Sequence, residues 1–531
     1  MKGQGFLYKI ATEPWEFQQI HRLNYRTFVE EIPQHPLNPE KVLVDKFHAE
    51  NTYCIGLVGD RVVGMVAVRG KRPFSLDAKV ANLDDFLPVG ESVVEVRLLA
   101  VEPEFRRGRL LAGLFRFMAE ECVRRGYSLG VASGTLRQAR LYSRMGFVPF
   151  GQPVGTAEAS YQPMYITLAS ALKVFERLGE PLAAEARPIS FLPGPVEVQQ
   201  RVREAFCSPA LSHRTDRFLA IVADTKELLG QLTGANSVAL LLGSGTLGND
   251  AVAAQLKLLG GRGLVLSNGE FGGRLIDHAE RFGLSFAAMV MPWGAAYDLD
   301  KIEGFLAGHK DISWLWSTHC ETSTGILNDL EALKKICERK GVRLCMDCTS
   351  SLGTVPVDLR GVYLATSVSG KGLASLPGLA LVFHNHVIDP DSRVPRYLDL
   401  GYYHAQRGVP FTHSSNLVQA VNMALRRGDW QDHFAEVQRL NALLRTELEK
   451  AGLQLFAGQD LSSPAVLSII LPDEVSSLEI GGRLEERGLL LSFRSGYLVE
   501  RNLIQICLMG DICEGQCRSL LTVFLDLLAA F

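Results

Sequence analysis

An alternation of short apolar runs and amphipathic stretches begins near residue 196, and it limits the possible folds more than any other feature of the sequence. The apolar runs are VALLLG, GLVLS, FAAMVM, ISWLWS, VRLCMD, LATSVS and LALVF. Runs of this length that alternate with helical segments are typical of buried strands in a parallel sheet. We therefore expect an α/β fold in which helices cover a mostly parallel sheet.

The chain has 531 residues, too many for a single hydrophobic core, so we expect more than one domain. Residues 1–170 alternate short helices and strands, which indicates an α+β domain. A charged stretch over residues 171–187 precedes a proline-rich segment, and we interpret it as a linker. The remaining residues, 188–531, divide into a large part over about 196–430 and a smaller α+β lobe over about 431–531.

Charge and composition exclude several classes of function. The 55 lysines and arginines nearly balance the 58 aspartates and glutamates, and a net charge of −3 disfavours a nucleic-acid partner. The N-terminus does not resemble a leader peptide and no apolar run approaches ~20 residues, so we expect a cytoplasmic protein with no membrane segment. Cys345 and Cys348 lie on a predicted strand, where their side chains point to opposite faces, so we expect no metal site.

Three motifs that follow predicted strands offer complementary chemistry. Lys371 is flanked by Gly370 and Gly372, so a bulky cofactor can approach it. Asp347 ends the run VRLCMD, at the strand edge where open α/β sheets bind ligands. The segment LLGSGTLGND offers hydroxyls and a helix N-terminus to a phosphate. An amine, a carboxylate and a phosphate site are the three groups that hold pyridoxal phosphate.

Residues 188–531 resemble the class V (fold type I) aminotransferases, close to the alanine–glyoxylate and 2-aminoethylphosphonate–pyruvate branch. The blocks that carry the resemblance, in family order, are LPGP, SHR, GSGT, NGEFGGR, THCETSTG, MDCTSSLG, SGK and PFTHSS. The resemblance implies pyridoxal 5'-phosphate as the cofactor. It also implies a small-molecule amine or amino acid and a 2-oxo acid as substrates, and a homodimer.

The resemblance also implies roles for individual residues. Lys371 would bind the cofactor covalently and then move the proton at the substrate α-carbon, for which its amine must be neutral. Asp347 would keep the pyridine nitrogen protonated. The remaining contacts would be Ser244, Gly245 and Thr246 at the phosphate, Phe271 stacked on the ring, Ser323 against the cofactor, and Thr412 at the phosphate of the neighbouring subunit.

Two departures from the family pattern affect the substrate. Relatives end in a strand whose Arg clamps the substrate carboxylate, whereas QICLMG has Gln505 at that position. A neutral amide cannot replace a bidentate guanidinium, and Arg494 is our candidate for a replacement, although a solvated edge charge is an equally good interpretation. Gly370 stands where relatives often carry Gln or Asn. A pyridoxal-phosphate lyase or decarboxylase therefore remains an alternative. A cysteine desulfurase would need an exposed catalytic cysteine in a loop, whereas Cys507, Cys513 and Cys517 lie in segments that we expect to be a strand and a helix.

Within residues 1–170, the strand ESVVEVRLLAV leads into a basic turn and an amphipathic helix. The turn can present its basic residues and the helix N-terminus to a pyrophosphate. The candidate acyl-carrier-binding residues are Arg106, Arg107, Gly108 and Arg109.

This region resembles the GNAT N-acyltransferases, near the autoinducer-synthase and N-acyl-amino-acid-synthase branch, on VEPEFR, LYSRMGF and NYRTFVEE. The resemblance implies a GNAT α+β domain that uses acyl-CoA or an acyl-carrier protein. Glu95 would be the general base and Tyr142 the proton donor to the departing thiolate. We expect a bifunctional enzyme, in which an aminotransferase that makes or consumes an amine is joined to an N-acyltransferase that can acylate it. The alternative is a non-catalytic acyl-binding domain that regulates the cofactor enzyme.

Overall fold

The computed structural model describes residues 6–32, 34–88, 90–106, 110–136, 139–155, 160–167, 170–171 and 188–529. Its contacts divide the chain into two compact units, Met1–Arg187 with Cys513–Ser519, and Pro188–Ile512 with Leu520–Phe531. The linker predicted over residues 171–187 lies almost wholly outside the described residues, as do Arg107, Gly108 and Arg109. In the described ranges, no helix has the length and apolarity to cross a bilayer, and no cluster of His, Cys, Asp and Glu can hold a metal.

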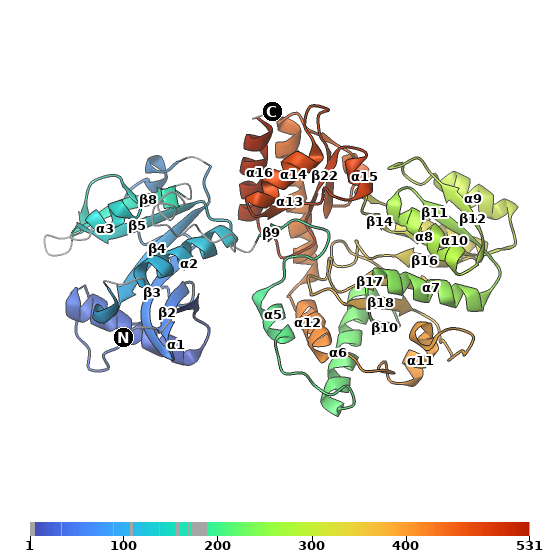
Figure 1. Cartoon of the computed structure of the whole chain (residues 1–531), viewed down its shortest axis with the longest axis horizontal. Coiled ribbons are helices and arrows are strands. Elements are labelled where there is room, and N and C mark those ends of the chain that lie inside the picture. Colours follow the sequence, from blue (N-terminus) through green and yellow to red (C-terminus); the bar gives the residue numbers. More distant parts are fainter. Residues whose placement is uncertain are drawn as a thin grey trace. The chain divides into compact units, whose positions relative to one another are not determined.

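The first unit is built on one mixed sheet with the strand order β1-β2-β3-β4-β5-β8-β6, and β7 pairs with β8. Its strands are β1 Leu7–Ile10, β2 Thr52–Val58, β3 Arg61–Arg69, β4 Val93–Val101, β5 Leu129–Thr135, β6 Val148–Pro149, β7 Val154–Gly155 and β8 Ser160–Thr167. Its helices are α1 Pro14–Tyr25, α2 Leu110–Arg124 and α3 Ala139–Arg144. Because side chains alternate along a strand, Cys54 packs in the core beneath α2 and Tyr53 in the core beneath α1. The two helices therefore cover opposite faces of the sheet (Figure 1).

Strands β4 and β5 separate partway along their length. Their parallel pairing ends at Glu95 and Val131, although both strands continue. A β-bulge lies in the same part of β4, where Leu98 and Leu99 stand opposite the single residue Val66, and Leu98 has a φ of 54°. A bulge bends its strand and re-aims the side chains around it, so the two strands present unpaired edges to the space between them.

The second unit contains a sheet with the order β10-β18-β17-β16-β13-β11-β12. The strands are β10 Ser237–Leu242, β11 Arg262–Ser267, β12 Ser285–Val290, β13 Ile312–Thr318, β16 Arg343–Asp347, β17 Leu364–Val368 and β18 Leu379–His384. The strands from β17 to β12 are parallel to one another, and β18 runs antiparallel to both of its neighbours. The predicted α/β class and mostly parallel sheet are confirmed, and each apolar run named above is a strand.

Helices cover both faces of this sheet (Figure 1). Residues Val265 and Trp316 pack in the cluster that includes α7 Gly245–Leu259 and α8 Glu270–Arg281. Their neighbours Leu264 and Leu315 pack in the opposite cluster, with α6 Asp216–Thr233, α9 Leu299–Gly308, α10 Leu330–Lys340 and α12 Ser415–Leu425. The strands are apolar on both faces because both faces are covered. Two short helices, α5 Gln200–Phe206 and α11 Leu400–Ala405, complete this part.

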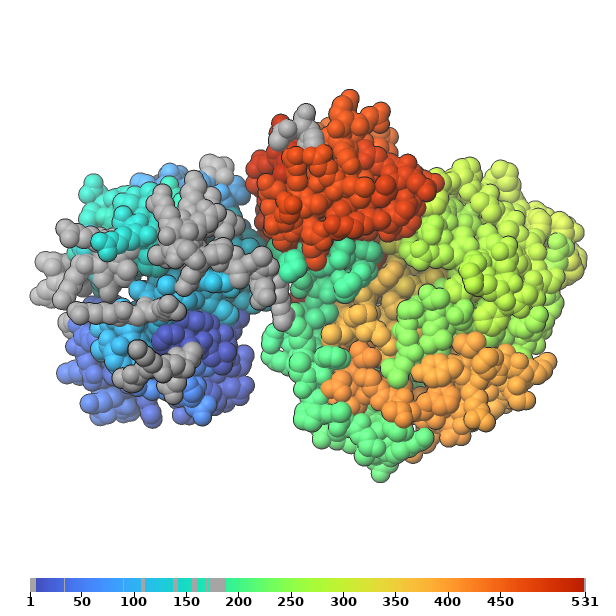
Figure 2. Space-filling view, in the orientation of Figure 1, coloured from blue at the N-terminus to red at the C-terminus, as the bar shows by residue number. Residues whose placement is uncertain are grey.

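The C-terminal residues form a smaller sheet with helices in the same unit, as predicted for an α+β lobe. The sheet has the order β19-β20-β22, from Gln454–Leu455, Val466–Ile470 and Leu503–Cys507. The helices are α13 Trp430–Lys450, α14 Ser477–Glu486, α15 Gly496–Val499 and the part of α16 Glu514–Leu528 that follows Ser519. Strand β21, Leu489–Leu490, pairs with β9, Ile189–Ser190, so residues near the start and the end of the unit lie side by side (Figure 2).

Candidate active site

A cavity of about 340 Å³ lies at the carboxyl ends of β13, β16 and β17. Ligands of open α/β sheets bind at this edge. The cavity wall brings together most of the predicted cofactor residues, namely Ser244, Gly245, Thr246, Phe271, Asp347 and Lys371.

Lys371 follows β17 and extends into this cavity. Its Nζ donates a hydrogen bond to Ser350 Oγ at 3.0 Å and lies 5.4 Å from the centre of the Phe271 ring. Burial lowers the pKa of Lys371, and the Asp347 carboxylate acts in the opposite direction. A lowered pKa increases the fraction of neutral amine, which is the form that attacks a carbonyl group.

Asp347 is the last residue of β16 and is buried. Its Oδ2 accepts a hydrogen bond from Asn249 Nδ2 at 2.9 Å, and its Oδ1 accepts one from the Thr349 amide at 2.8 Å. Asn249 in turn accepts a hydrogen bond from Thr366 Oγ1 at 2.8 Å. The carboxylate is therefore fixed in one orientation. Asn249 is a positioning residue that the sequence motifs did not single out, although LLGSGTLGND contains it.

The start of α7 forms a site for an anion, in contrast to the negatively charged carboxylate of Asp347. Ser244 is the N-cap residue, its side chain does not cap the helix, and Gly245 and Thr246 begin the first turn. The first amides of a helix have no intrahelical acceptor, and the helix dipole favours an anion there. This end of the cavity therefore fits a phosphate group.

The cavity fits pyridoxal phosphate. It combines an amine for the aldehyde, a fixed carboxylate for the ring nitrogen and a helix N-terminus for the phosphate. Thr349, which also lines the cavity, buries its Oγ1 without a hydrogen-bond partner, so it has a donor to offer to a bound group.

Phe271 is held in the cavity wall by a buried acid that the sequence analysis missed. Glu321 Oε1 accepts a hydrogen bond from the Phe271 amide at 3.2 Å, and its Oε2 accepts one from the Gly272 amide at 2.9 Å. These amides begin α8, so Glu321 caps the helix that carries Phe271. Burial raises the pKa of Glu321, while these bonds and the Ser323 hydroxyl oppose the shift. The block THCETSTG contained this residue, but spacing alone did not show which side chain faced the helix.

Two predicted cofactor residues lie outside the cavity wall. Ser323 is fully buried, and its Oγ donates to Glu321 at 2.5 Å and accepts from the Glu270 amide at 3.1 Å. The adjacent residue Thr322 lines the cavity instead. Thr412 is exposed in the segment between α11 and α12.

Gln505 has a structural role in this chain. It lies on β22 and is fully buried, and its Nε2 donates to the Thr322 carbonyl at 2.7 Å and to Ser468 Oγ at 2.8 Å. The amide therefore ties the segment that contains Thr322 to the smaller lobe and does not line the cavity. Gly370 is required by packing, because a Cβ atom there would lie 2.7 Å from the Pro377 Cα. This contact explains the absence of a larger residue before Lys371.

Arg494, the predicted replacement for the family Arg, does not line the cavity. Its side chain is 61% exposed, pairs with Glu485 at 2.6 Å and lies over the Phe493 ring at 4.4 Å. Its surroundings are those of a solvated edge charge, the other interpretation that the sequence permitted. The cavity wall includes a different guanidinium, that of Arg274 on α8.

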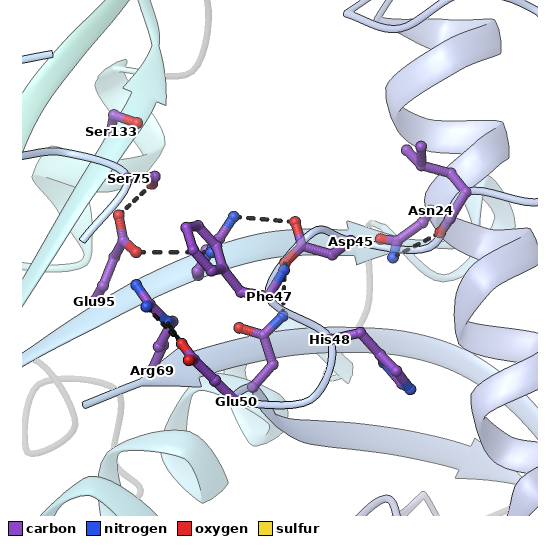
Figure 3. Close-up of polar contacts among 12 residues, drawn as sticks. Asn24, Asp45, Phe47, His48, Glu50, Arg69, Ser75, Glu95 and Ser133 are labelled. Carbon is purple, nitrogen blue, oxygen red and sulfur yellow. Dashed lines mark hydrogen bonds and ion pairs between the residues drawn. The ribbon is translucent and has the colours of Figure 1, made fainter. Parts of the chain in front are cut away.

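A second cavity, of about 760 Å³, lies in the first unit where β4 and β5 separate. Its wall includes the predicted residues Glu95, Tyr142 and Arg106. Glu95 is only 3% exposed, and its Oε1 accepts hydrogen bonds from the Leu76 amide at 3.1 Å and from the Ser75 hydroxyl (Figure 3). Its Oε2 is buried without a hydrogen-bond partner. Burial raises the pKa of Tyr142, so its phenol stays protonated. Arg106 forms an ion pair with Glu31 at 2.6 Å.

An adjoining cavity of about 240 Å³ is almost wholly apolar. It shares Val96, Leu111, Phe115 and Phe147 with the larger cavity. Its other apolar lining residues include Val94, Met118, Cys122, Leu129, Met145 and Ile166. Such a wall favours an aliphatic group over a polar one.

Comparisons with known proteins match a different family to each unit. Residues 198–390 match the class-V aminotransferase family, and residues 19–168 match the family described as N-acyl amino acid synthase FeeM. The soluble hydrogenase 42 kDa subunit of Anabaena cylindrica is 32% identical, over 54% of this chain and 80% of that protein. The 2-aminoethylphosphonate–pyruvate transaminase of Pseudomonas aeruginosa is 29% identical, over 63% and 94%. The crystal structure of alanine–glyoxylate aminotransferase from Nostoc sp. has a TM-score of 0.59 and 28% identity, and the match covers 64% of this chain and 96% of that one.

Fold and cavity together define an enzyme with transferase activity whose fold implies pyridoxal phosphate. The chain belongs to the class V aminotransferase family through its second unit. The first unit contains the residues that are similar to the N-acyl amino acid synthase family.

Proposed function

We propose that the chain is a bifunctional enzyme. The second unit transfers an amino group between a small amine or amino acid and a 2-oxo acid with pyridoxal phosphate. The first unit acylates an amine, and an acyl-CoA or acyl-carrier protein donates the acyl group. The observation that carries the proposal is the cavity shared by Lys371, Asp347 and the start of α7, in a chain that also holds Glu95 in a separate cavity.

Each residue of the second-unit cavity has a defined task. Pyridoxal phosphate supplies an aldehyde that binds amines and a protonated ring that withdraws electrons from the substrate α-carbon. Lys371 would bind the aldehyde group of the cofactor and move a proton at the substrate α-carbon, because burial lowers its pKa and so favours the neutral amine. Asp347, fixed by Asn249, would keep the ring nitrogen protonated. The first turn of α7 would bind the phosphate.

A 2-oxo acid also needs a cation for its carboxylate, and we assign this task to Arg274. Among the described residues, the cavity wall holds the basic side chains of Arg274, His278 and Lys371. His278 is hydrogen-bonded to Asp250 at 2.8 Å, and Lys371 is the reacting amine. The Arg274 guanidinium lies 4.8 Å from the centre of the Phe271 ring, and only its Nε is bonded to Glu270. Its Nη groups are therefore available to a carboxylate.

Replacing Arg274 with Gln should raise the KM for the 2-oxo acid and lower kcat/KM by ~10- to 100-fold, because a charge-assisted hydrogen bond is lost. The measurement is steady-state amino-group transfer to pyruvate and glyoxylate. The matched control is Arg494→Gln, which changes an arginine that is 61% exposed and outside the cavity wall, and should leave both constants within ~2-fold.

Equal effects of the two substitutions would contradict the role of Arg274. The same assay separates an aminotransferase from a lyase or decarboxylase. Amino-group transfer depends on the added 2-oxo acid, whereas a lyase or decarboxylase consumes the amino donor without it.

The first unit has the features of an acyl-transfer site. The unpaired edges of β4 and β5 can accept the amide groups of a pantetheine arm. The adjoining apolar cavity fits an aliphatic acyl chain. Glu95 is positioned to remove a proton from the attacking amine, and Tyr142 to donate one to the departing thiolate. The related family is described as an N-acyl amino acid synthase, so we propose an amino acid as the acceptor.

The second unit is proposed to act as a homodimer. Thr412 is exposed and does not line the cavity of its own chain, which suits a contact with the phosphate site of a neighbouring subunit. A dimer would therefore complete each cofactor site.

A further inference from the structure

We propose that Lys79 and Ser133 bind the carboxylate of the acyl acceptor, and that one turn of the chain positions both this anion site and Glu95. The inference rests on the proposed acyl-transfer function of the first unit. It names the residues that would make the enzyme select amino acids over simple amines.

The turn formed by residues 75–79 builds one side of the cavity. Its start holds Glu95, because the Ser75 hydroxyl and the Leu76 amide donate hydrogen bonds to Glu95 Oε1. Its end is fixed by the Lys79 amide, which donates to the Leu76 carbonyl at 2.9 Å. The same short segment thus orients the proposed base and places the Lys79 side chain in the cavity wall.

Lys79 is exposed at the cavity wall and forms no ion pair with a carboxylate of the described residues. Its Nζ donates a long hydrogen bond of 3.4 Å to Ser133 Oγ and lies 5.2 Å from the centre of the Tyr161 ring. Partial desolvation of the ammonium lowers the pKa of Lys79, and the Glu95 carboxylate counteracts this effect. An anion bound at the ammonium would raise this pKa again and would stabilise the charge.

The other charged side chains of the cavity are engaged elsewhere. Arg106 pairs with Glu31 at 2.6 Å, so neither is free to bind an acceptor. Arg97 donates to Asp45 Oδ2 at 3.0 Å, and its guanidinium lies 4.7 Å from the Phe47 ring.

Asp45 and Phe47 are themselves fixed. Asp45 Oδ1 accepts from Asn51 at 2.9 Å, and Arg69 lies 3.8 Å from the same Phe47 ring and pairs with Glu50 (Figure 3). Arg97 therefore serves as a rigid positive neighbour of Glu95, with Nη1 3.8 Å from Oε2. Arg97 Nε and Nη1 have no hydrogen-bond partner among the described residues, but the guanidinium is ion-paired with Asp45 and Glu95. Lys79 differs from the cavity arginines because it forms no ion pair with a carboxylate of the described residues, and we therefore assign the acceptor carboxylate to it.

Glu95 Oε2, which accepts no hydrogen bond from the described residues, is the atom that we expect to receive the proton of the acceptor amine. Oε2 is buried without a hydrogen-bond partner in a side chain that is 3% exposed. An amine that gives its proton to this oxygen would satisfy it. Ser133, on β5, lines the same cavity as Lys79 and Glu95. We infer that one small molecule can place its amine at Glu95 and its carboxylate at the Lys79–Ser133 pair, and Figure 3 shows Ser133 and Glu95.

The test compares acceptors that differ only in the carboxylate. The full-length protein is assayed with dodecanoyl-CoA and either L-phenylalanine or 2-phenylethylamine. The wild-type protein should prefer phenylalanine, and Lys79→Met should lower its kcat/KM by ~10- to 100-fold, mainly through KM. The same substitution should leave the rate with phenylethylamine within ~3-fold, because that amine has no anion to bind. Ser133→Ala should change the preference in the same direction by a smaller factor.

The matched control is Lys71→Met, which changes a lysine that is 74% exposed and paired with Glu50 outside the cavity. It should leave the preference unchanged. Equal activity with both acceptors in the wild-type and Lys79→Met proteins would overturn the anion site while leaving acyl transfer intact. If the wild-type protein transfers the acyl group to neither of these acceptors nor to any other amine, the proposed acyl-transfer function is overturned, and this inference with it.

Discussion

Replacing Lys371 with Ala should abolish amino-group transfer, with a loss of at least ~1,000-fold, because the substitution removes both the covalent attachment and the group that moves the proton. The purified wild-type protein should absorb visible or near-visible light once pyridoxal phosphate is added, and the variant should lose the band of the lysine-bound cofactor. The only hydrogen bond of the Lys371 amine within the described residues is to Ser350, so the fold should persist.

The chain contains its own control for this experiment. N-acylation by the first unit does not use Lys371, and its rate in the variant should equal that of the wild-type protein. A wild-type protein that stays colourless with added cofactor would contradict the assignment. So would a Lys371→Ala protein that transfers amino groups at the original rate.

Glu95→Gln should lower N-acylation by ~100- to 10,000-fold, the range over which a general base contributes. The amide keeps the shape of the side chain and an oxygen that can accept from Ser75 and Leu76, so it removes the base while keeping the local structure. The measurement is thiol release from an acyl-CoA in the presence of an amino acid, with acyl-CoA binding followed separately.

Amino-group transfer should be unchanged in Glu95→Gln and supplies the matched internal control. A variant that binds and transfers acyl groups as the wild-type protein does would show that Glu95 is not the base. A wild-type protein that binds acyl-CoA without turnover would favour a regulatory acyl-binding domain.

The fold followed from sequence because the strands of the second unit are buried on both faces. Leu264 and Val265 pack into different clusters, so the run GLVLS had to be apolar throughout. Asp347 and Lys371 could be singled out as candidates for a related reason, since Asp347 ends one such run and Lys371 follows another after Gly370.

Residues whose role depends on the direction of a side chain were harder to predict. Ser323 and Thr322 are neighbours in a sharp turn, and spacing could not tell which one faces the cavity. Arg494 is drawn to the surface by Glu485, and Gln505 is held by the Thr322 carbonyl, 183 residues away in sequence. These partners come together only in the folded chain.

The most direct test of whether the Lys371 site and the Glu95 site act on the same amine is an experiment with isotopically labelled nitrogen. The full-length protein is incubated with pyridoxal phosphate, a labelled amino donor, an unlabelled 2-oxo acid and a long-chain acyl-CoA, and the products are identified by mass spectrometry. We expect an N-acyl amino acid that combines the carbon skeleton of the 2-oxo acid with labelled nitrogen. Lys371→Ala and Glu95→Gln should each abolish it, and a mixture of the two variants should restore it. The proposed coupling would be contradicted if the protein forms the labelled free amino acid and acylates other amines, yet never acylates that amino acid.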